Sequence, residues 1–214
     1  MTLKERAIEI SKIFDKLYPE AGCTLNYEDP IQLLISTQLA AQCTDERVNI
    51  VTATLFKKYK DVYDFAKADV NELEEDIKST GFYRNKARNI IACCNMIIDK
   101  FGGKIPQNME EMLKLPGVGR KTANVVLGNV FGIPGVIVDT HAKRLSNRIG
   151  LSKNAQPEKI EFDLMDILPK EIWTKFSNQL VYHGRAVCNA RTPKCSRCAI
   201  NYLCDYYTNN NTNM

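Results

Sequence analysis

The 214-residue sequence has no long apolar run and no apolar leader, although apolar residues make up 44% of it. A membrane-spanning helix needs about 18 or more consecutive apolar residues. The charged, amphipathic start MTLKERAIEISKIF lacks the apolar core of a signal peptide. We therefore expect a cytoplasmic protein without a membrane-spanning segment, built as one large domain or as two closely joined ones.

Acidic residues are missing from two long stretches, although the chain as a whole has 25 of them against 29 basic residues. No carboxylate side chain occurs in residues 112–138 or in residues 172–204. The second stretch contains five basic residues, Lys175, Arg185, Arg191, Lys194 and Arg197. This separation of charge indicates a surface that faces phosphate groups. Solvated basic loops are the simpler alternative, because the net charge is only +4.

Patterns typical of strands are almost absent, and apolar residues recur at helical spacing instead. One such stripe runs through residues 3–17, and another marks a helix around residues 48–56. Asp29-Pro30 is typical of a helix start, so we expect a helix that continues to about Leu39. Only residues 136–138 look extended, which is too short for a sheet. The prediction is an all-α fold of many short helices.

Helix boundaries are marked by polar pairs and by glycines. The pairs that resemble capping boxes are Asp69 with Glu72 and Asn108 with Glu111. The glycines placed to end helices are Gly102, Gly103, Gly132 and Gly150. The polar, asparagine-rich tail, residues 208–214, is expected to fray.

The stretch LPGVGRKTANVVL, residues 115–127, combines a turn with a helix start. Its proline and the two glycines Gly117 and Gly119 predict a tight turn between two helices, the second of which begins near Arg120. Unpaired N–H groups at the start of that helix suit a phosphate oxygen. This is a helix-hairpin-helix pattern, which predicts that Gly117, Gly119 and Arg120 contact DNA. A plain glycine turn is the alternative.

Lys121 and Asp139 are the residues of this region that could carry chemistry. An amine attacks only when it is neutral, and the positive end of a helix, partial burial and the neighbouring Arg120 all favour the neutral form. Asp139 is the first carboxylate after Glu111 and precedes the next helix. A solitary carboxylate there suits the stabilisation of a sugar cation and the acceptance of protons. The simpler roles are a phosphate contact for Lys121 and an N-cap for Asp139.

LPGVGRKTANVVL followed by VDTH resembles the helix-hairpin-helix/Gly-Pro-Asp glycosylase superfamily, and specifically its endonuclease III branch. The resemblance covers roughly residues 25 to 205. It implies that Lys121 attacks C1′ of the sugar with the help of Asp139, and that the resulting Schiff base permits β-elimination 3′ to the lesion. Relatives that only remove the base have a different residue at the lysine position. The implied enzyme is a bifunctional DNA glycosylase and abasic-site lyase that removes oxidised pyrimidines from duplex DNA in base excision repair.

Four of the eight cysteines are crowded near the C-terminus in the pattern Cys188-x6-Cys195-x2-Cys198-x5-Cys204. From the spacing alone, four thiolates could hold either zinc or an iron–sulfur cluster. The resemblance implies a [4Fe–4S] cluster, because endonuclease III enzymes carry one on this spacing. Arg191 and Lys194 lie inside the six-residue loop, where they are expected to contact DNA phosphates. The remaining cysteines are interpreted as ordinary small buried residues: Cys23, Cys43, Cys93 and Cys94.

Two further segments resemble the family's loops that fill the gap left when a base is flipped out of the duplex. LAAQCTD, residues 39–45, places Gln42 as an intercalating residue, and STGFYRNKA, residues 79–87, places Phe82 in a second wedge. Better-known members have leucine at the position of Phe82, so the lesion preference is left open. By residue type alone, Gln42 would be an ordinary exposed polar residue and Phe82 a core aromatic. His141 is a further candidate for DNA contact, with a structural role at the helix start as the alternative.

The resemblance implies two helical domains with a DNA-binding cleft between them. Residues 22–133 are expected to form a six-helix domain with the helix-hairpin-helix motif, and residues 1–21 with 134–214 an iron–sulfur cluster domain. Lys121 and Asp139 would lie at opposite lips of the cleft, in a monomer associated with the nucleoid. A monofunctional mismatch or adenine glycosylase is one alternative, although it would not need Lys121. A non-catalytic DNA-binding module is another, although it would not need Lys121 together with Asp139.

Overall fold

The computed structural model describes residues 1–211, which form α-helices and short 3-10 turns without any strand. The all-α prediction is therefore confirmed, and residues 136–138 lie outside the helices. No helix in this range is both long and apolar enough to cross a membrane. The chain divides into two compact units, one of residues 1–22 with 134–214 and the other of residues 23–133.

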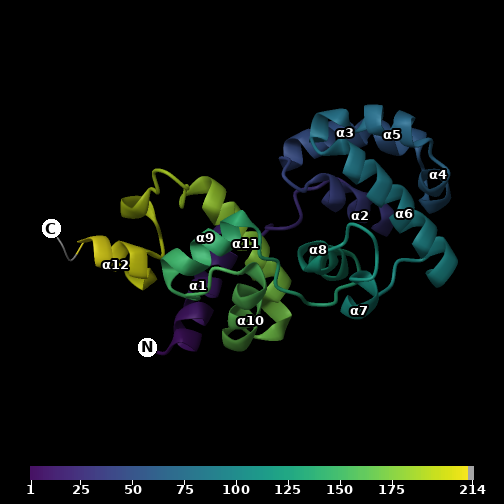
Figure 1. The fold of residues 1–214 in the computed structure, drawn as a ribbon. Helices are drawn as coiled ribbons and strands as arrows, with labels where there is room; N and C mark the ends of the chain where they lie inside the picture. Colours follow the sequence, from purple (N-terminus) through teal and green to yellow (C-terminus); the bar gives the residue numbers. More distant parts are fainter. Residues whose placement is uncertain (212–214) are drawn as a thin grey trace. The chain divides into compact units, whose positions relative to one another are not determined.

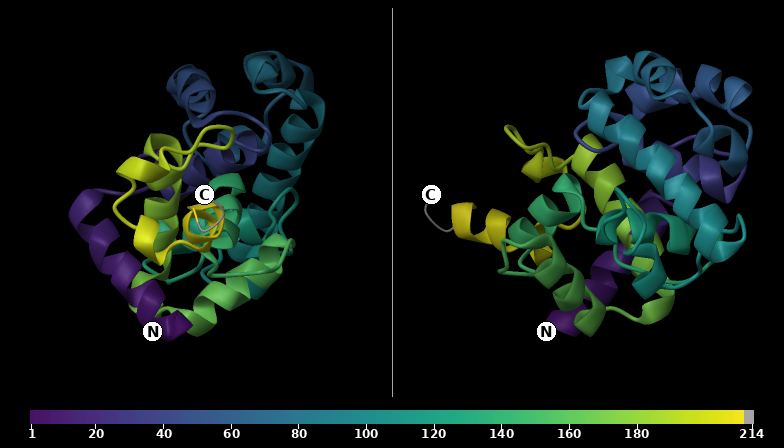
Figure 2. Two further views of the ribbon diagram at one scale, coloured as in Figure 1. Left: turned by 90° about the vertical axis from the view of Figure 1, so that its left-hand side faces the viewer. Right: turned by 45° about the vertical axis from the view of Figure 1, so that its right-hand side comes forward.

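The first unit is built from both ends of the chain. Its elements are α1 (Leu3–Leu17), α9 (Thr140–Ile149), α10 (Pro157–Ile167), the 3-10 turn η2 (Lys170–Ile172), α11 (Trp173–Ala186), the turns η3 (Cys195–Arg197) and η4 (Asn201–Leu203), and α12 (Asp205–Asn211). The N-terminal helix α1 contacts α10 and α11, as Figures 1 and 2 show. Its residues Ile10 and Phe14 are fully buried in one apolar core with Leu164, Phe176 and Leu180. The first helix therefore belongs to the same folding unit as the C-terminal segment.

The second unit contains seven α-helices, and α2 lies at its centre. Its elements are α2 (Pro30–Leu39), α3 (Asp45–Lys58), α4 (Val62–Ala66), α5 (Val70–Asp76), the 3-10 turn η1 (Lys78–Thr80), α6 (Tyr83–Phe101), α7 (Met109–Met112) and α8 (Arg120–Val130). Helix α2 contacts α3, α6 and α8, while the long α6 also packs on α4 and α5 (Figure 1). Residues 33–39 of α2 are all buried. A helix that is covered on every side in this way fixes the elements around it.

The two predicted capping boxes form only in part. Asp69 and Asn108 each accept a hydrogen bond from the backbone N–H three residues on, at 3.0 and 2.9 Å. Glu111 then pairs with the side-chain amide of Asn108 rather than with its backbone N–H. A complete box lies at the start of α1, where the side chain and backbone of Thr2 both bond to Glu5. An N-cap is worth about 1 kcal/mol, so each of these bonds helps to fix a helix start.

The predicted glycine stops are confirmed, whereas the tail differs from the prediction. Gly102 and Gly150 end α6 and α9 in the left-handed conformation, with φ of 61° and 88°. Residues 208–211 do not fray but belong to α12, and residues 212–214 lie outside the described range. Asp205 at the start of α12 pairs with Arg6 of α1, whose guanidinium also donates a 2.8 Å hydrogen bond to the Gly150 carbonyl. This anchor holds the start of α12 next to α1 and to the end of α9.

Candidate active site

The helix-hairpin-helix motif of the second unit lies between α7 and α8, and its two glycines are needed for different reasons. Gly117 has a φ of +73°, and a Cβ there would lie 2.9 Å from the Cβ of Asn89 and 3.0 Å from Oε1 of Gln38. Backbone conformation and close packing therefore both exclude a side chain at Gly117. Gly119 has a φ of −102°, and a Cβ there would meet no heavy atom within 4 Å. The lack of a side chain at Gly119 therefore leaves the space beside its Cα open.

That open space lies at the start of α8. Gly119 is the N-cap residue, and no side-chain cap bond satisfies the N–H groups of the first turn. These groups lack intrahelical partners and carry partial positive charge. Arg120 and Lys121 add two cationic side chains directly after them. The start of α8 is therefore an open, electropositive site that suits a phosphate oxygen.

Lys121 is exposed in the first turn of α8, and no described residue forms a hydrogen bond or ion pair with its side chain. The sequence predicts a partly buried Lys121, and this prediction is wrong because the residue is exposed. Its electrostatic neighbour is Cys23. Burial raises the pKa of the Cys23 thiol, and the Lys121 ammonium acts in the opposite direction. Sequence reasoning missed this neighbour, because the two residues are far apart in the chain and no motif connects them.

Asp139 belongs to the first unit, where it is the N-cap residue of α9. Its Oδ1 accepts a 2.7 Å hydrogen bond from the N–H of Ala142. The segment before it is held in place, because Ile137 donates a 2.9 Å hydrogen bond to Ser177 of α11 and residues 136–138 are buried. No described residue forms a hydrogen bond with Oδ2 of Asp139. The carboxylate can therefore cap the helix with one oxygen and offer the other to a substrate.

Gln42 and Phe82 share an unusual backbone conformation. Among the described residues they are the two non-glycine residues with positive φ, at 55° and 49°. Both are exposed, and Phe82 leaves 62% of its surface accessible, so the reading of Phe82 as a core aromatic is wrong. Such conformations cost about 1–3 kcal/mol each and concentrate at functional sites. Each loop therefore holds its side chain outward at a conformational cost.

His141 is engaged inside the first unit. Its Nδ1 lies 3.1 Å from a guanidinium nitrogen of Arg144, and a Cβ at Gly184 would lie 2.7 Å from the same ring nitrogen. Arg144 also donates to the carbonyls of Gly184 and Cys188, at 3.1 and 3.0 Å. The ring thus has a structural role between α9 and α11, and contact of His141 with DNA stays a prediction.

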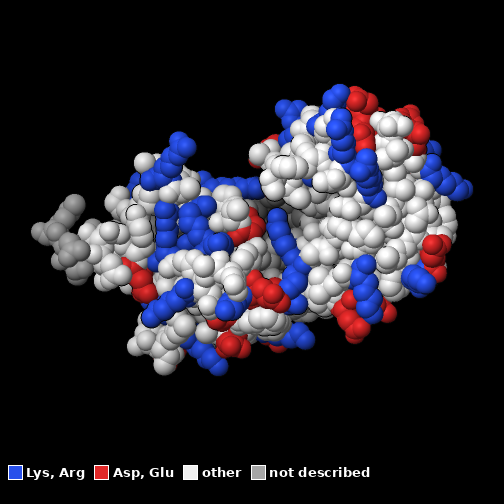
Figure 3. All heavy atoms as spheres, viewed as in Figure 1, with Lys and Arg blue, Asp and Glu red and all other residues white. Residues whose placement is uncertain are grey.

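Arg191 and Lys194 lie in the exposed loop between the first two cysteines of the C-terminal group. The Lys194 ammonium donates a 3.1 Å hydrogen bond to the carbonyl of Ala186, the last residue of α11. Further basic side chains gather over α9 on the face of the first unit that Figure 3 shows. These side chains over α9 lie outside the two acid-free stretches of the sequence, and contact of Arg191 and Lys194 with phosphates stays a prediction.

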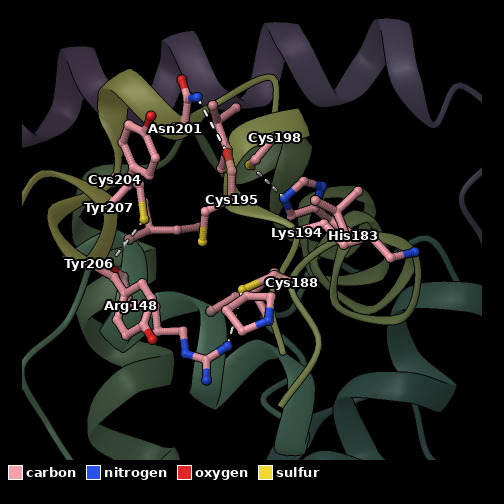
Figure 4. A pocket seen from close by; sticks show the side chains of 15 residues that line it. Arg148, His183, Cys188, Lys194, Cys195, Cys198, Asn201, Cys204, Tyr206 and Tyr207 are labelled. Atoms are coloured by element: carbon pink, nitrogen blue, oxygen red, sulfur yellow. Dashed lines mark hydrogen bonds between the residues drawn. The ribbon is translucent and has the colours of Figure 1, made fainter. Parts of the chain in front are cut away.

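The four C-terminal cysteines line one pocket of the first unit, and they are Cys188, Cys195, Cys198 and Cys204. Their side chains surround one hollow, as Figure 4 shows. All four are free and partly buried. Within residues 1–211, no three Cys, His, Asp or Glu side chains are placed to hold a metal ion. The four side chains therefore line one hollow without being gathered around a single ion.

Burial controls the protonation of this pocket. It raises the pKa of Cys198 to about 11, and it also raises the pKa of Cys195 and of Cys204. Burial lowers the pKa of His183 to about 4, and Nε2 of this neutral ring lies 3.3 Å from Sγ of Cys198. Thiols in such surroundings stay protonated unless a cation binds to them.

Arg148 of α9 also lines the pocket, and no sequence motif singles it out. Its guanidinium donates to the carbonyls of Asn189 and Ala190 at 2.8 and 2.7 Å, and it lies 3.5 Å from Sγ of Cys188. It also lies over the ring of Tyr206, 4.9 Å from the ring centroid. Arg148 therefore fixes the start of the cysteine loop and connects it to α12.

Comparisons with known proteins agree along nearly the whole chain. Residues 35–170 match the family model described as HhH-GPD superfamily base excision DNA repair protein. The chain is 56% identical over 202 residues to an endonuclease III of Synechocystis sp. and 44% identical over 205 residues to one of Bacillus subtilis. These alignments cover 94% and 95% of this chain and 92% and 93% of the relatives.

Solved structures of endonuclease III and of a related glycosylase also match nearly the whole chain. A trapped covalent intermediate of endonuclease III with DNA matches with a TM-score of 0.93 and 43% identity, over 98% of this chain and 99% of that one. A thermostable thymine-DNA glycosylase matches with a TM-score of 0.87 and 25% identity, over 96% of this chain and 98% of that one.

Proposed function

The chain belongs to the endonuclease III branch of the HhH-GPD superfamily of base excision DNA repair proteins, and we propose which of its residues carry out the repair reaction. It is a bifunctional DNA glycosylase and abasic-site lyase for oxidised pyrimidines in duplex DNA. The observation that supports the assignment of roles best is the placement of Lys121. Its side chain is exposed, has no hydrogen bond or ion pair with a described residue, and follows directly after the open space at Gly119.

Lys121 is the nucleophile in this proposal. Its neutral amine forms a bond to C1′ of the damaged nucleotide, while the bond from C1′ to the base breaks and the base leaves with that electron pair and takes up a proton. Loss of a proton from the nitrogen and opening of the sugar ring give a Schiff base. Removal of a proton from C2′ then breaks the C3′–O3′ bond and cuts the strand 3′ to the lesion. The covalent intermediate of the related endonuclease III with DNA supports this route.

Asp139 supplies the negative charge that this reaction needs. A carboxylate stabilises the positive charge that develops on the sugar as the base leaves, and it can accept the protons that are released. Oδ2 is suited to both tasks, because only Oδ1 is used in the helix cap. The lack of other acidic residues from 112 to 138 leaves this charge without a nearby competitor in the sequence.

The remaining candidates hold and open the duplex. In this proposal the start of α8 binds a backbone phosphate, and Arg191 and Lys194 bind others, so the enzyme is positioned without reading the sequence. Flipping a base out of the stack costs a few kcal/mol. Stacking of a base on an aromatic side chain is worth about 1–3 kcal/mol. An exposed Phe82 that fills the gap together with Gln42 therefore offsets a large part of the cost of base flipping. We propose that the repair reaction takes place at the nucleoid in the cytoplasm.

We further propose that the four C-terminal cysteines hold a [4Fe–4S] cluster. The donor set fits, because four thiolates are the usual ligands of this cluster. The arrangement also fits, because all four cysteines line one hollow while no three Cys, His, Asp or Glu side chains of residues 1–211 are placed around a single ion, as tetrahedral zinc requires. When bound, the cluster supplies a rigid cross-link that deprotonates the thiols and ties the basic loop to α11 and α12. Arg148 and His183 orient the ligands by the contacts described above.

The cofactor proposal predicts the metal content of the purified protein. We expect about four iron and four sulfide ions per chain. Cys198→Ser should lower both contents and the midpoint of thermal unfolding, because a cluster ligand is lost, whereas Cys94→Ser, on α6 of the other unit, should leave the iron content unchanged. Iron, sulfide and zinc assays on the same preparations make the measurement. Protein that carries stoichiometric zinc and no sulfide would contradict the proposal.

The proposed function is tested on a duplex that contains one thymine glycol or one abasic site. With borohydride present, we expect a covalent protein–DNA adduct, and without borohydride we expect strand cleavage 3′ to the lesion. Folded, cluster-loaded protein that binds the duplex but gives neither product would contradict the lyase activity. Release of the base without cleavage would indicate a monofunctional glycosylase, and binding alone would indicate a DNA-binding module.

A further inference from the structure

Lys86 is a buried lysine that joins two elements of the second unit. Its side chain, on a residue only 6% exposed, extends from the first turn of α6. The ammonium donates 2.8 Å hydrogen bonds to the carbonyls of Leu39 and Thr80. No carboxylate of residues 1–211 pairs with it. A buried cation needs acceptors that compensate for lost water, so these two carbonyls are essential partners of Lys86.

The two carbonyls stand directly before the loops that carry Gln42 and Phe82. Leu39 is the last residue of α2 and Thr80 is the last residue of η1. The backbone N–H of Lys86 also donates a 3.1 Å hydrogen bond to the carbonyl of Phe82. One residue thus bonds to the base of the first loop and to both ends of the short second loop.

No other hydrogen bond in the described chain connects these loops directly. The bonds within residues 39–44 and within residues 77–82 are local turns, such as Cys43 N–H to Ala40 and Thr80 N–H to Ile77. The carbonyl ends of helical elements carry partial negative charge, which attracts a cation. Burial lowers the pKa of Lys86, because removal from water disfavours the charged ammonium. The two carbonyls compensate for part of this loss of hydration. The bridge by Lys86 is therefore the polar connection that fixes the spacing of the two loops.

We propose that Lys86 is a positioning residue that holds the two loops at a fixed spacing, so that Gln42 and Phe82 enter the DNA as a pair. This inference rests on the proposed function, in which both side chains fill the gap left by the flipped base. Lys86 does not touch the DNA. It acts through the backbone of the two loops, whose left-handed residues would otherwise relax to other conformations.

The test compares Lys86→Met with the wild type. Methionine keeps most of the buried stem and removes the ammonium, so the two carbonyls lose their common partner. We expect single-turnover excision of thymine glycol from a duplex to slow by about 10- to 100-fold, because small displacements of positioning groups have effects of this size. Cleavage of an abasic site in single-stranded DNA, which needs no opening of a stack, should keep its rate. Lys100→Met, an exposed position on the same helix, is the matched control and should behave as wild type in both assays.

A double-mutant cycle separates positioning from general stability. With Lys86 present, Gln42→Ala and Phe82→Ala should be coupled, so that the double variant departs from the product of the single effects by about twofold or more. In the Lys86→Met background this coupling should vanish. A purely structural role of Lys86 would lower the unfolding midpoint and leave the coupling intact, which would overturn the proposal. Wild-type excision of the duplex lesion by Lys86→Met would overturn it as well.

Failure of the proposed function has its own signature. If neither Gln42→Ala nor Phe82→Ala slows duplex excision while Lys86 is present, the insertion of these side chains is wrong, and the role of Lys86 is rejected with it. If both slow excision but Lys86→Met does not, only the role of Lys86 is rejected. Should Lys86→Met fail to fold, Lys86→Gln takes its place, since its shorter amide cannot reach both carbonyls and the same outcomes apply.

Discussion

Lys121→Gln is expected to abolish both the borohydride-trapped adduct and strand cleavage, with single-turnover rates at least about 1,000-fold below the wild type. Loss of an enzyme's nucleophile has effects of this order or larger, because no other group then forms the covalent intermediate. Glutamine keeps a polar side chain of similar bulk at an exposed position, where the Lys121 side chain forms no hydrogen bond or ion pair with a described residue. The fold and the unfolding midpoint should therefore be unchanged.

The matched control for this prediction is Lys57→Gln. Lys57 is also an exposed helical lysine of the second unit, in the last turn of α3, so its replacement removes the same charge away from the hairpin. It should retain the adduct and the cleavage. Strand cleavage that persists in Lys121→Gln at a rate near that of the control would show that another amine is the nucleophile.

Much of the fold could be predicted because helix periodicity and caps are local properties of the sequence. Asp29-Pro30 marks the start of α2, where Asp29 accepts a 2.9 Å hydrogen bond from the N–H of Gln32. Gly150 ends α9 in the conformation that glycine adopts most readily. The complete capping box at Thr2 was missed, although threonine followed three residues later by glutamate is a readable signal of it. Local rules therefore account for where the helices begin and end.

The site was less accessible from the sequence, because its details depend on contacts between distant segments. Phe82 is exposed and has a left-handed backbone, and its residue type indicates neither property. Cys23 lies near Lys121, and Lys86 bonds to the carbonyl of Leu39, yet neither pair forms a pattern in the chain. The arrangement of the four C-terminal cysteines around one pocket is likewise a property of folded loops. Motifs thus identify which residues carry the chemistry, whereas tertiary structure identifies the residues that hold them in place.

Asp139→Asn should separate the two roles of this residue, because asparagine caps a helix as well as aspartate does but carries no charge. We expect the unfolding midpoint to remain that of the wild type while base excision slows by about 100- to 10,000-fold, the usual effect of losing a positioned acid–base group. Asp139→Ala should slow excision as much and should also lower the free energy of unfolding by about 1 kcal/mol, since the 2.7 Å bond to the N–H of Ala142 is lost. Thermal unfolding and single-turnover excision measure the two effects separately.

Asp69 provides the matched pair of controls, since it also caps a helix, α5, through hydrogen bonds from the backbone N–H groups of Asn71 and Glu72. Asp69→Ala should destabilise the protein by a similar amount, and neither it nor Asp69→Asn should slow excision in folded protein. Excision by Asp139→Asn at the wild-type rate would show that the carboxylate of Asp139 is only a cap. Stability that falls in Asp139→Asn as far as in Asp139→Ala would show that its charge is needed for the fold. We expect both Asp139 variants to lose excision, but only Asp139→Asn to keep full stability. This result requires a carboxylate oxygen of Asp139 that is not used in the helix cap, and Oδ2 is such an oxygen.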